Sequence, residues 1–137
     1  MKRKLGPYNM VITEMTPRRP YLFRAMYDWI VDNERTPYIV VNTSIYGVIV
    51  PNEYIQNNQI VLNIAPQSIG QYIATNEKIE FNARFAGNPY HIVVPMAAIE
   101  AIYARENSVG LGFDPEPQYE KQEEEPQKTT NPFRVVK

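Results

Sequence analysis

Several residue types that support particular functions are missing from this sequence or scarce in it. The 137-residue chain has no cysteine, which excludes disulfide bonds, thiolate nucleophiles and cysteine-ligated metals. Its formal net charge of -1 offers no electrostatic attraction for nucleic acid or for an acidic membrane surface. No apolar run approaches the roughly 18 residues that a membrane span needs, and Met1 to Glu14 is too polar for a secretory signal. These absences predict a cytoplasmic protein that binds neither nucleic acid nor membrane.

Residues that perform catalysis are equally scarce. His91 is the single histidine, and a lone histidine on a strand is usually an ordinary surface or boundary residue. Carboxylates are scattered singly before the tail, and phosphate-binding and nucleophile-elbow motifs do not occur in the sequence. Gly110-Leu111-Gly112 stands alone and is better explained as a turn or a bulge. We therefore expect no enzymatic activity, no catalytic residue, no cofactor and no metal site.

The composition changes near Phe113. Aromatic and β-branched residues recur before it, whereas residues 114–132 are acidic, polar and rich in proline. Such a segment buries too little apolar surface to offset the entropy of ordering it, so 114–132 is predicted to be a flexible linker. The last five residues, Phe133 to Lys137, are again apolar and basic. A short apolar cluster after a polar linker is the usual form of a peptide docked by a partner, although the chain could simply end in this way.

An amphipathic helix is predicted at the start of the domain. Thr16-Pro17 is typical of a helix N-cap followed by proline at the first helical position, and the helix should end near Asn33. Apolar residues recur between these points at three- and four-residue spacing, namely Leu22, Phe23, Met26, Trp29 and Ile30. Core packing explains such a stripe, but part of so wide an apolar face could instead bury against a second copy of the chain.

After Pro37 the pattern changes to the two-residue period of β-strands. Strands are predicted at Tyr38–Val41, Tyr46–Val50, Gln59–Ile64, Lys78–Phe85 and Tyr90–Val94, with turns at Asn57-Asn58 and Gly87-Asn88-Pro89. Residues 96–106 are ambiguous, because alanine and glutamate favour a helix while Ile102-Tyr103 could belong to a strand; a short helical turn followed by a strand is the favoured prediction. One helix followed by roughly five to seven short strands indicates an α+β fold, with a strongly bent antiparallel sheet or a small barrel.

Two of these predicted strands carry material for binding. The segments Gln59–Pro66 and Phe81–Gly87 mix large apolar residues with alanine and glycine, and small residues on a strand let another backbone approach closely. Asn63, Asn82 and Arg84 could supply hydrogen bonds beside an apolar floor. This combination suits an extended peptide. Equally, the phenylalanines could be core residues whose small neighbours relieve crowding.

Long strings of the sequence resemble the stringent starvation protein B family. The matching strings keep their order from about Met15 to Phe113 and resume at the terminus: Thr16–Leu22, Trp29, Thr36-Pro37, Ile60–Pro66, Phe81–Phe85, Ala101–Asn107 and Arg134–Lys137. The resemblance implies a proteolytic adaptor whose core, residues 15–113, is a small Sm-like β-fold. It also implies a homodimer joined largely through the N-terminal helix, with an interface that would use Leu22, Phe23, Met26, Tyr27 and Ile30.

The same resemblance implies two protein partners. A groove in the core would capture the ssrA degradation tag that trans-translation adds to stalled nascent chains, and a terminal peptide would dock on the zinc-binding N-terminal domain of the ClpX unfoldase. By position, the tag-binding residues would be Asn63, Ala65, Pro66, Phe81, Ala83, Arg84 and Phe85. The docking peptide would be Phe133, Arg134, Val135, Val136 and Lys137, with Phe133 at a position where the family is expected to have leucine.

The mechanism implied by the resemblance is tethering. A tagged protein held on the core, with the tail docked on the unfoldase, would reach the protease at an effective concentration near millimolar. The linker would span on the order of 25 Å as a flexible chain, and residues 1–14 would be a disordered extension. ATP hydrolysis and peptide cleavage would belong to the ClpXP partner. Two alternatives remain, a general peptide-binding module and an RNA-binding Sm-like module, although a pI near 5.9 argues against the second.

Overall fold

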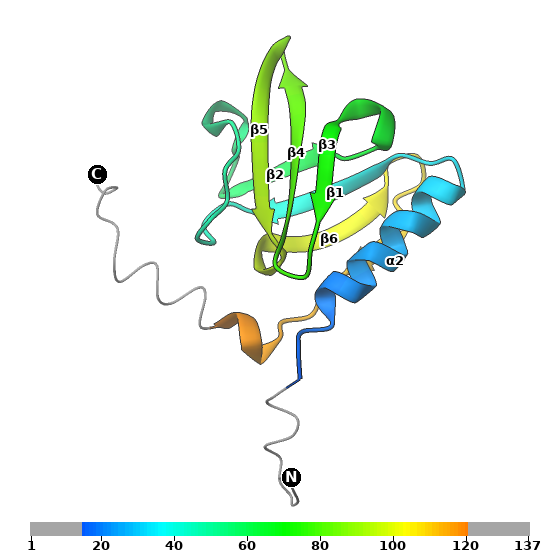
Figure 1. Cartoon of the computed structure of the whole chain (residues 1–137), viewed down its shortest axis with the longest axis vertical. Helices are drawn as coiled ribbons and strands as arrows, with labels where there is room; N and C mark the ends of the chain where they lie inside the picture. Colours follow the sequence, from blue (N-terminus) through cyan, green and yellow to red (C-terminus); the bar gives the residue numbers. More distant parts are fainter. Residues whose placement is uncertain (1–14, 121–137) are drawn as a thin grey trace, which may run out of the picture.

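The computed structural model describes residues 15–120, in which a helix packs against two antiparallel sheets (Figure 1). The predicted extension 1–14, the linker from residue 121 onward and the predicted docking peptide 133–137 lie outside the described residues. The main elements are α2 (Arg19–Asp32), β1 (Pro37–Asn42), β2 (Gln59–Asn63), β3 (Gly70–Ala74), β4 (Lys78–Phe85), β5 (Asn88–Pro95), β6 (Ile99–Ala104) and β7 (Gly110–Gly112). Short 3-10 helices lie between them, namely η1 (Asn52–Tyr54), η2 (Pro66–Ser68) and η3 (Met96–Ala98).

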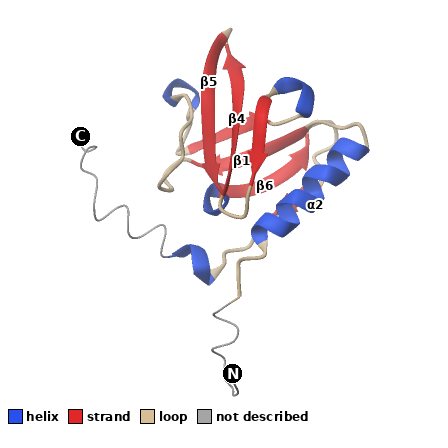
Figure 2. Ribbon diagram, in the orientation of Figure 1, coloured by secondary structure: helices blue, strands red, loops and turns tan. Residues whose placement is uncertain are grey.

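The strands divide into two antiparallel sheets. One sheet has the order β2-β1-β6-β7 and the other the order β3-β4-β5. A bridge between Ile49 and Val93 joins the loop after β1 to β5. Figure 2 shows the two sheets crossing, with α2 along one side of them. The predicted α+β class is therefore confirmed, and the sheets bend across one another without closing into a barrel.

The core lies between the two sheets and the helix. Strand β1 alternates buried and half-buried positions, so that Ile39 and Val41 point inward. From the other sheet Phe81 on β4 and Ile92 on β5 are fully buried, and Phe23 joins them from α2. Each such side chain contributes about 1.5–3 kcal/mol by leaving water. This shared core holds the two sheets in a fixed relative position.

The helix begins later than the sequence indicated. Thr16 and Pro17 precede it, and the cap position is Arg18, whose side chain makes no capping bond. Pro20 falls in the first turn as predicted, where its missing N–H costs nothing. The predicted cap at Thr16 is therefore wrong, because another part of the chain supplies the capping oxygens. The end at Asn33, by contrast, is confirmed.

The sheet differs from the prediction in three places. Residues 46–50 form a loop, and Ile49 alone makes a β-bridge there. Strand β3 was not predicted, because its partly exposed residues lack a clean alternation of burial. Gly110–Gly112 is strand β7 and not a turn. The turn-then-strand prediction for 96–106 is confirmed by η3 and β6, and positive φ values at Asn57 and Asn58 confirm a tight turn there.

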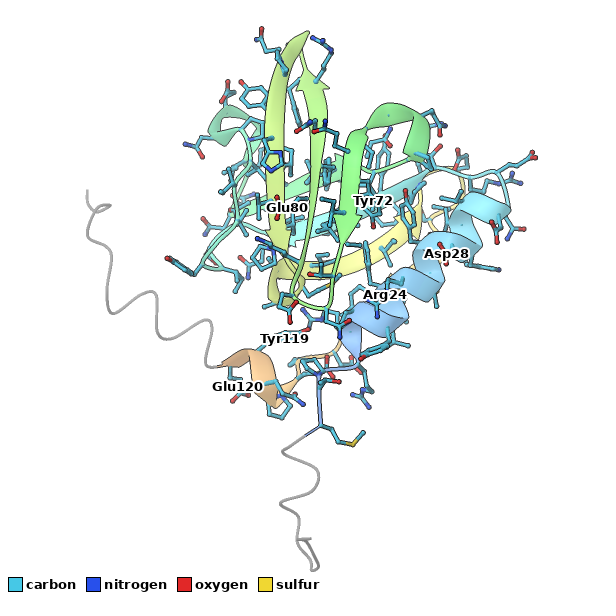
Figure 3. The ribbon with its side chains drawn as sticks, viewed as in Figure 1. Arg24, Asp28, Tyr72, Glu80, Tyr119 and Glu120 are labelled. Carbon is cyan, nitrogen blue, oxygen red and sulfur yellow. The ribbon has the colours of Figure 1, made fainter. Side chains whose placement is uncertain are left out.

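The start of the predicted linker packs on the domain. Glu116 retains only 7% of its accessible surface, and its carboxylate accepts hydrogen bonds from the backbone N–H groups of Arg18 at 2.7 Å and Arg19 at 3.2 Å. Tyr119 sits in a short helical turn over 117–120 and is also buried, beside the N-terminal end of α2 (Figure 3). Residues 114–120 thus belong structurally to the domain and cap its helix.

Buried Arg19 fastens this segment to the rest of the core. Its guanidinium donates hydrogen bonds to the carbonyl oxygens of Met96, Ala97 and Ile99 at 3.0–3.2 Å, and to that of Asp114 at 3.0 Å. Its charged carbon also lies 4.7 Å from the centre of the Tyr119 ring. A planar guanidinium with several donors can satisfy many carbonyls at once, which a lysine cannot do.

Candidate peptide-binding groove

A groove opens where strand β3 leaves strand β4. The two strands pair as far as Gly70 opposite Asn82. Beyond that point, among the residues that the structure describes, Ala83–Phe85 have β5 as a neighbour on one side and no strand on the other. The chain before Gly70 turns away as η2. An edge of this kind presents backbone N–H and C=O groups to an extended segment that lies beside it.

The groove has a volume of about 650 Å³ and is lined by three segments. The chain through η2 to the start of β3 forms one side, β4 forms the middle, and β5 forms the other side. The lining residues are Gln67, Ser68, Ile69, Gly70, Asn82, Ala83, Arg84, Pro89, Tyr90 and His91. In Figure 1 these segments are the green turn before β3 and the outer halves of β4 and β5. A small side chain such as Ala83 leaves room for a second backbone.

Two of the residues predicted to bind a peptide, Ala83 and Arg84, line the groove. Three others support its η2 side. The Asn63 side-chain oxygen accepts a hydrogen bond from the Ala65 N–H at 2.9 Å, and Pro66 is the first residue of η2. Ala65 itself is buried. These three residues direct the chain away from β2 and into the side of the groove.

The two phenylalanines of the prediction behave differently from each other. Phe81 is fully buried in the core and has no surface left for a ligand. Phe85 is half-buried, and its ring centre lies 5.1 Å from that of Tyr54 and 5.6 Å from that of Tyr90. The hydroxyl of Tyr90 donates to the Glu53 carboxylate at 3.2 Å. Loss of contact with water, and next the nearby Glu53 charge, raise the pKa of the Tyr90 hydroxyl. Phe85 therefore anchors the aromatic end of the groove through Tyr90.

A chain of polar side chains crosses all three strands at the other end of the groove. The Asn82 amide donates to Gln71 Oε1 at 2.7 Å, while Asn82 Oδ1 lies 2.8 Å from His91 Nδ1. His91 Nε2 lies 3.0 Å from Glu80, which also pairs with Lys78 at 2.9 Å. The hydrogen bond from Lys78, and next that from His91, lower the pKa of Glu80. These five residues are called the cross-strand network below.

The sequence did not reveal most of the lining residues. Gln67 to Ile69 precede an unpredicted strand, and Gly70 is its first residue. Pro89 was assigned to a turn but lies in β5, and Tyr90 and His91 were assigned only to a strand. Pro66, which begins η2, was a usable signal, because proline is favoured in the first turn of a helix. No local signal could have shown that pairing of β3 with β4 begins only at Gly70 and leaves Ala83–Phe85 without a partner on that side, since that depends on pairing between distant segments.

The outward face of α2 is a second candidate surface. Of the residues predicted to contact a second copy, Phe23 and Ile30 are buried within their own chain. Tyr27 donates to the Ile64 carbonyl at 3.0 Å and stacks on Tyr72 of β3 with ring centres 5.2 Å apart. Burial is the main reason that the pKa of each of these two tyrosines is raised. These three side chains therefore face the chain's own core.

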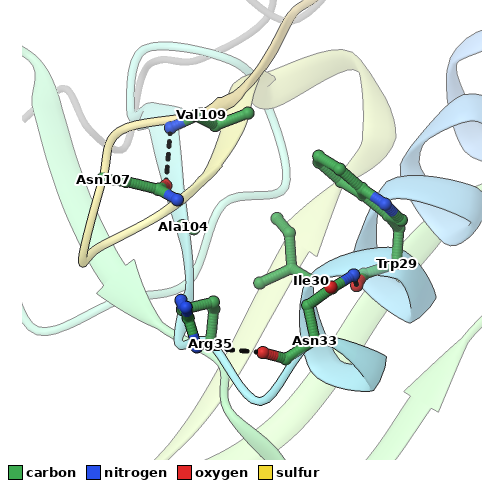
Figure 4. Close-up of a pocket in the computed structure, with 7 residues that line it drawn as sticks. All are labelled: Trp29, Ile30, Asn33, Arg35, Ala104, Asn107 and Val109. Atoms are coloured by element: carbon green, nitrogen blue, oxygen red, sulfur yellow. Dashed lines mark hydrogen bonds between the residues drawn. The ribbon is translucent and has the colours of Figure 1, made fainter.

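What remains exposed on this face is another apolar stripe. Leu22 and Trp29 keep 43% and 49% of their surface, and half-buried Met26 lies between them. Trp29 also borders a cavity of about 120 Å³ at the end of the helix, where Val109 approaches from the turn before β7 (Figure 4). The stripe and its cavity leave apolar surface that the described chain does not cover.

Neither a cluster of metal ligands nor a membrane-spanning helix occurs within residues 15–120. In that range no three histidine or carboxylate side chains come together in a way that would hold a metal ion. The helices found there are too short or too polar to cross a membrane. The geometry of this region is that of a binding surface, with an open strand edge, a small-residue floor and fixed polar groups.

Comparisons with known proteins point in one direction. The family model for stringent starvation protein B matches residues 17–134 of this chain. A stringent starvation protein B homolog from Haemophilus influenzae is 50% identical to it over 111 residues, which cover 81% of this chain and 74% of that protein. The match spans α2, both sheets, the groove and the segment that caps α2.

Proposed function

The chain belongs to the stringent starvation protein B family, a family of adaptor proteins, and on that basis we propose that it binds the ssrA degradation tag and delivers tagged proteins to the ClpXP protease. The observation that carries the proposal is the groove beside β4, with its open strand edge and its lining of Ala83 and Arg84. Family membership suggests a degradation tag as the ligand, and the groove supports the proposal because an extended peptide would fit beside its open strand edge.

The groove suits an extended peptide rather than a compact ligand. A peptide lying along Ala83–Phe85 would pair with the free backbone groups of β4, which provides affinity that depends little on sequence. Side chains would provide selectivity. Arg84 is exposed and donates a hydrogen bond to the Gly87 carbonyl at 3.0 Å. This bond holds its charge at the rim of the groove, where it could bind a carboxylate or an amide oxygen of the tag.

Delivery would depend on the tail. The packed segment 114–120 moves the start of the tether from Asp114 to the residue after Glu120, and the proposed docking peptide is Phe133–Lys137. Holding the tagged protein and the unfoldase on one chain converts the second binding event into an intramolecular one. The adaptor needs no chemistry of its own in this scheme, since unfolding and cleavage take place on the partner.

The apolar stripe on α2 supports the second part of the proposal, a homodimer. Leu22, Met26 and Trp29 form a row along one helix face, and two such rows can pack against each other around a two-fold axis. Two tails on one dimer would raise avidity for the unfoldase. Phe23, Tyr27 and Ile30, which bury against their own sheet, would support this interface from behind without crossing it.

The test separates the two binding activities. Ala83→Gln fills the groove floor and should weaken binding of a labelled ssrA tag peptide at least tenfold in fluorescence anisotropy, since overpacking a tight contact is unfavourable. Ala101→Gln is the matched control, because Ala101 is an equally half-buried strand alanine in the other sheet. Removing residues 133–137 should leave tag binding unchanged and abolish the stimulation of ClpXP proteolysis.

Three results would contradict the proposal, and a fourth would favour an alternative. Tag binding that is unaffected by Ala83→Gln, or lost equally in Ala101→Gln, would show that the groove is not the binding site. Loss of tag binding after removal of 133–137 would refute the division between core and tail. Binding of RNA with a steep dependence on salt would favour the nucleic-acid alternative instead.

A further inference from the structure

The side of the groove nearest β3 depends on a bulge. The pairing of β3 with β4 shifts register between Gly70 and Ile73, and Gln71 within the shift has a φ of 52°. A non-glycine residue in this left-handed region is strained and needs its surroundings to hold it. The Gln71 side chain reaches across to the Asn82 amide at 2.7 Å. Since Gly70 lines the groove, this hydrogen bond helps to set the position of that side.

The oxygen of the Asn82 amide contacts His91. Because the amide nitrogen donates to Gln71, the Asn82 oxygen is the atom that faces His91 Nδ1, at 2.8 Å. The second ring nitrogen, Nε2, faces a Glu80 oxygen at 3.0 Å. Both neighbours accept hydrogen bonds. A neutral imidazole carries one N–H and can satisfy one of them, whereas the protonated ring carries two and satisfies both.

We propose that His91 is a positioning residue for the peptide groove, and that its protonation strengthens peptide binding. The proposal deepens the function proposed above and rests on it. With both N–H groups present, Asn82 is fixed and holds the Gln71 bulge against β4, so the groove is formed before the peptide arrives. Loss of the proton removes one of the two hydrogen bonds and leaves the groove less ordered. The peptide must then order the groove when it binds, which lowers its affinity. By linkage, a bound peptide must favour the protonated ring in return.

The charges around His91 are compatible with this role. From β4 the ring faces the Glu80 carboxylate, while Lys78 pairs with the same carboxylate from its other side. From η1 the Glu53 carboxylate binds the hydroxyl of the adjacent Tyr90. Arg84 lines the same groove and points toward Gly87. Histidine is the side chain whose charge ordinarily changes between pH 5.5 and 8, and this chain has a single one.

The experiment measures the affinity of the full-length chain for a rhodamine-labelled ssrA tag peptide between pH 5.5 and 8, at constant ionic strength. For the unmodified protein the dissociation constant should rise about three- to tenfold over this range, the equivalent of one net hydrogen bond. His91→Gln should show no such rise, because glutamine does not titrate. Asn88→Gln, also on β5 but outside the cross-strand network, should keep the rise of the unmodified protein.

A second readout follows the ring itself. The histidine signal in a proton NMR spectrum belongs to one residue, so the protonated fraction at pH 7 can be read with and without unlabelled peptide, and it should increase when peptide is added. A flat affinity profile, the same slope in His91→Gln, or an unchanged protonated fraction would each overturn the role of His91 while leaving the adaptor function standing. Absence of tag binding at every pH would overturn the proposed function, and with it this inference.

Discussion

Glu116 caps the N-terminal helix from the far end of the domain: its carboxylate lies 2.7 Å from the backbone nitrogen of Arg18 and 3.2 Å from that of Arg19. The first N–H groups of a helix lack partners within the helix, and its positive dipole end attracts an anion. Most helices satisfy this need with a residue just before the helix. Here a residue from the other end of the domain does so instead, and residues 114–120 lie beside the N-terminal end of the helix whose outer face is the proposed dimer surface.

Replacing this cap should destabilise the domain. Glu116→Ala removes two charge-assisted hydrogen bonds, and we expect the free energy of unfolding to fall by about 1–2 kcal/mol, the usual cost of losing a helix cap. The measurement is urea unfolding followed by circular dichroism. Glu120→Ala is the control, because Glu120 is exposed at the end of the same segment. Equal effects of both substitutions would show that the capping contact contributes nothing.

Gly110 should tolerate no side chain. A Cβ at this position would collide with the carbonyl oxygen of Ile102 and would come within 2.6 Å of Tyr103 Cβ, so Gly110→Ala must push β7 away from β6. We expect a loss of about 1–3 kcal/mol in thermal or urea unfolding, as for other overpacked sites. Gly112→Ala, on the same strand, meets nothing within 4 Å and should change stability little. A tolerated Gly110→Ala would indicate that β7 pairs only loosely.

Glu106 should make stability depend on acid pH. Hydrogen bonds from the Thr36 N–H at 2.9 Å and its hydroxyl at 2.7 Å lower the pKa of this carboxyl to about 2. In the unfolded chain a glutamate titrates near 4.3. The contribution is therefore complete above about pH 5 and is lost as the pH falls toward 2.

The matching measurement is the urea midpoint at several pH values. Glu106→Gln should have a lower midpoint than the unmodified protein at pH 6, and the two midpoints should converge as the pH falls toward 2. Glu77→Gln, at an exposed turn, should follow the unmodified protein throughout. A gap between Glu106→Gln and the unmodified protein that stays constant with pH would contradict the assignment.

A charge on the outward face of α2 should break the proposed dimer. Leu22→Asp places a carboxylate at the N-terminal end of the apolar stripe, where burial would be costly, so sedimentation should shift from dimer to monomer. Val61→Asp puts the same charge on β2 at a residue of similar exposure, 49% against 43% for Leu22, and should leave the dimer intact. A dimer that survives Leu22→Asp would place the contact on another surface.

Several features could be predicted from the sequence because their causes are local. The end of the helix at Asn33, the strand Lys78–Phe85 and the turn at Asn57-Asn58 follow from residue periodicity and from residues that accept a positive φ. The change of composition near Phe113 predicted the start of the linker too early, because residues 114–120 pack on the domain. Long strings of similarity then indicated the family, which the comparisons confirmed.

The predicted binding residues illustrate the limit of local reasoning. Ala83 and Arg84, which were predicted to bind a peptide, both line the groove, and small and charged residues next to each other on a strand are visible in the sequence. Phe81 was named with them but lies in the core. Alternation along β4 distinguishes the two faces of the strand, yet it does not say which face meets the rest of the protein.

Tertiary structure alone decided the remaining features. The groove exists because the chain before Gly70 does not pair with β4, and the helix is capped because Glu116 returns to Arg18 from 98 residues away. His91 was an isolated histidine in the sequence, and only strand pairing puts it between Asn82 and Glu80. Propensity and periodicity act over a few residues, so the sequence by itself determined the helix, most of the strands and the family. The contacts that make a site join residues far apart in the chain, and those depend on how the elements pack.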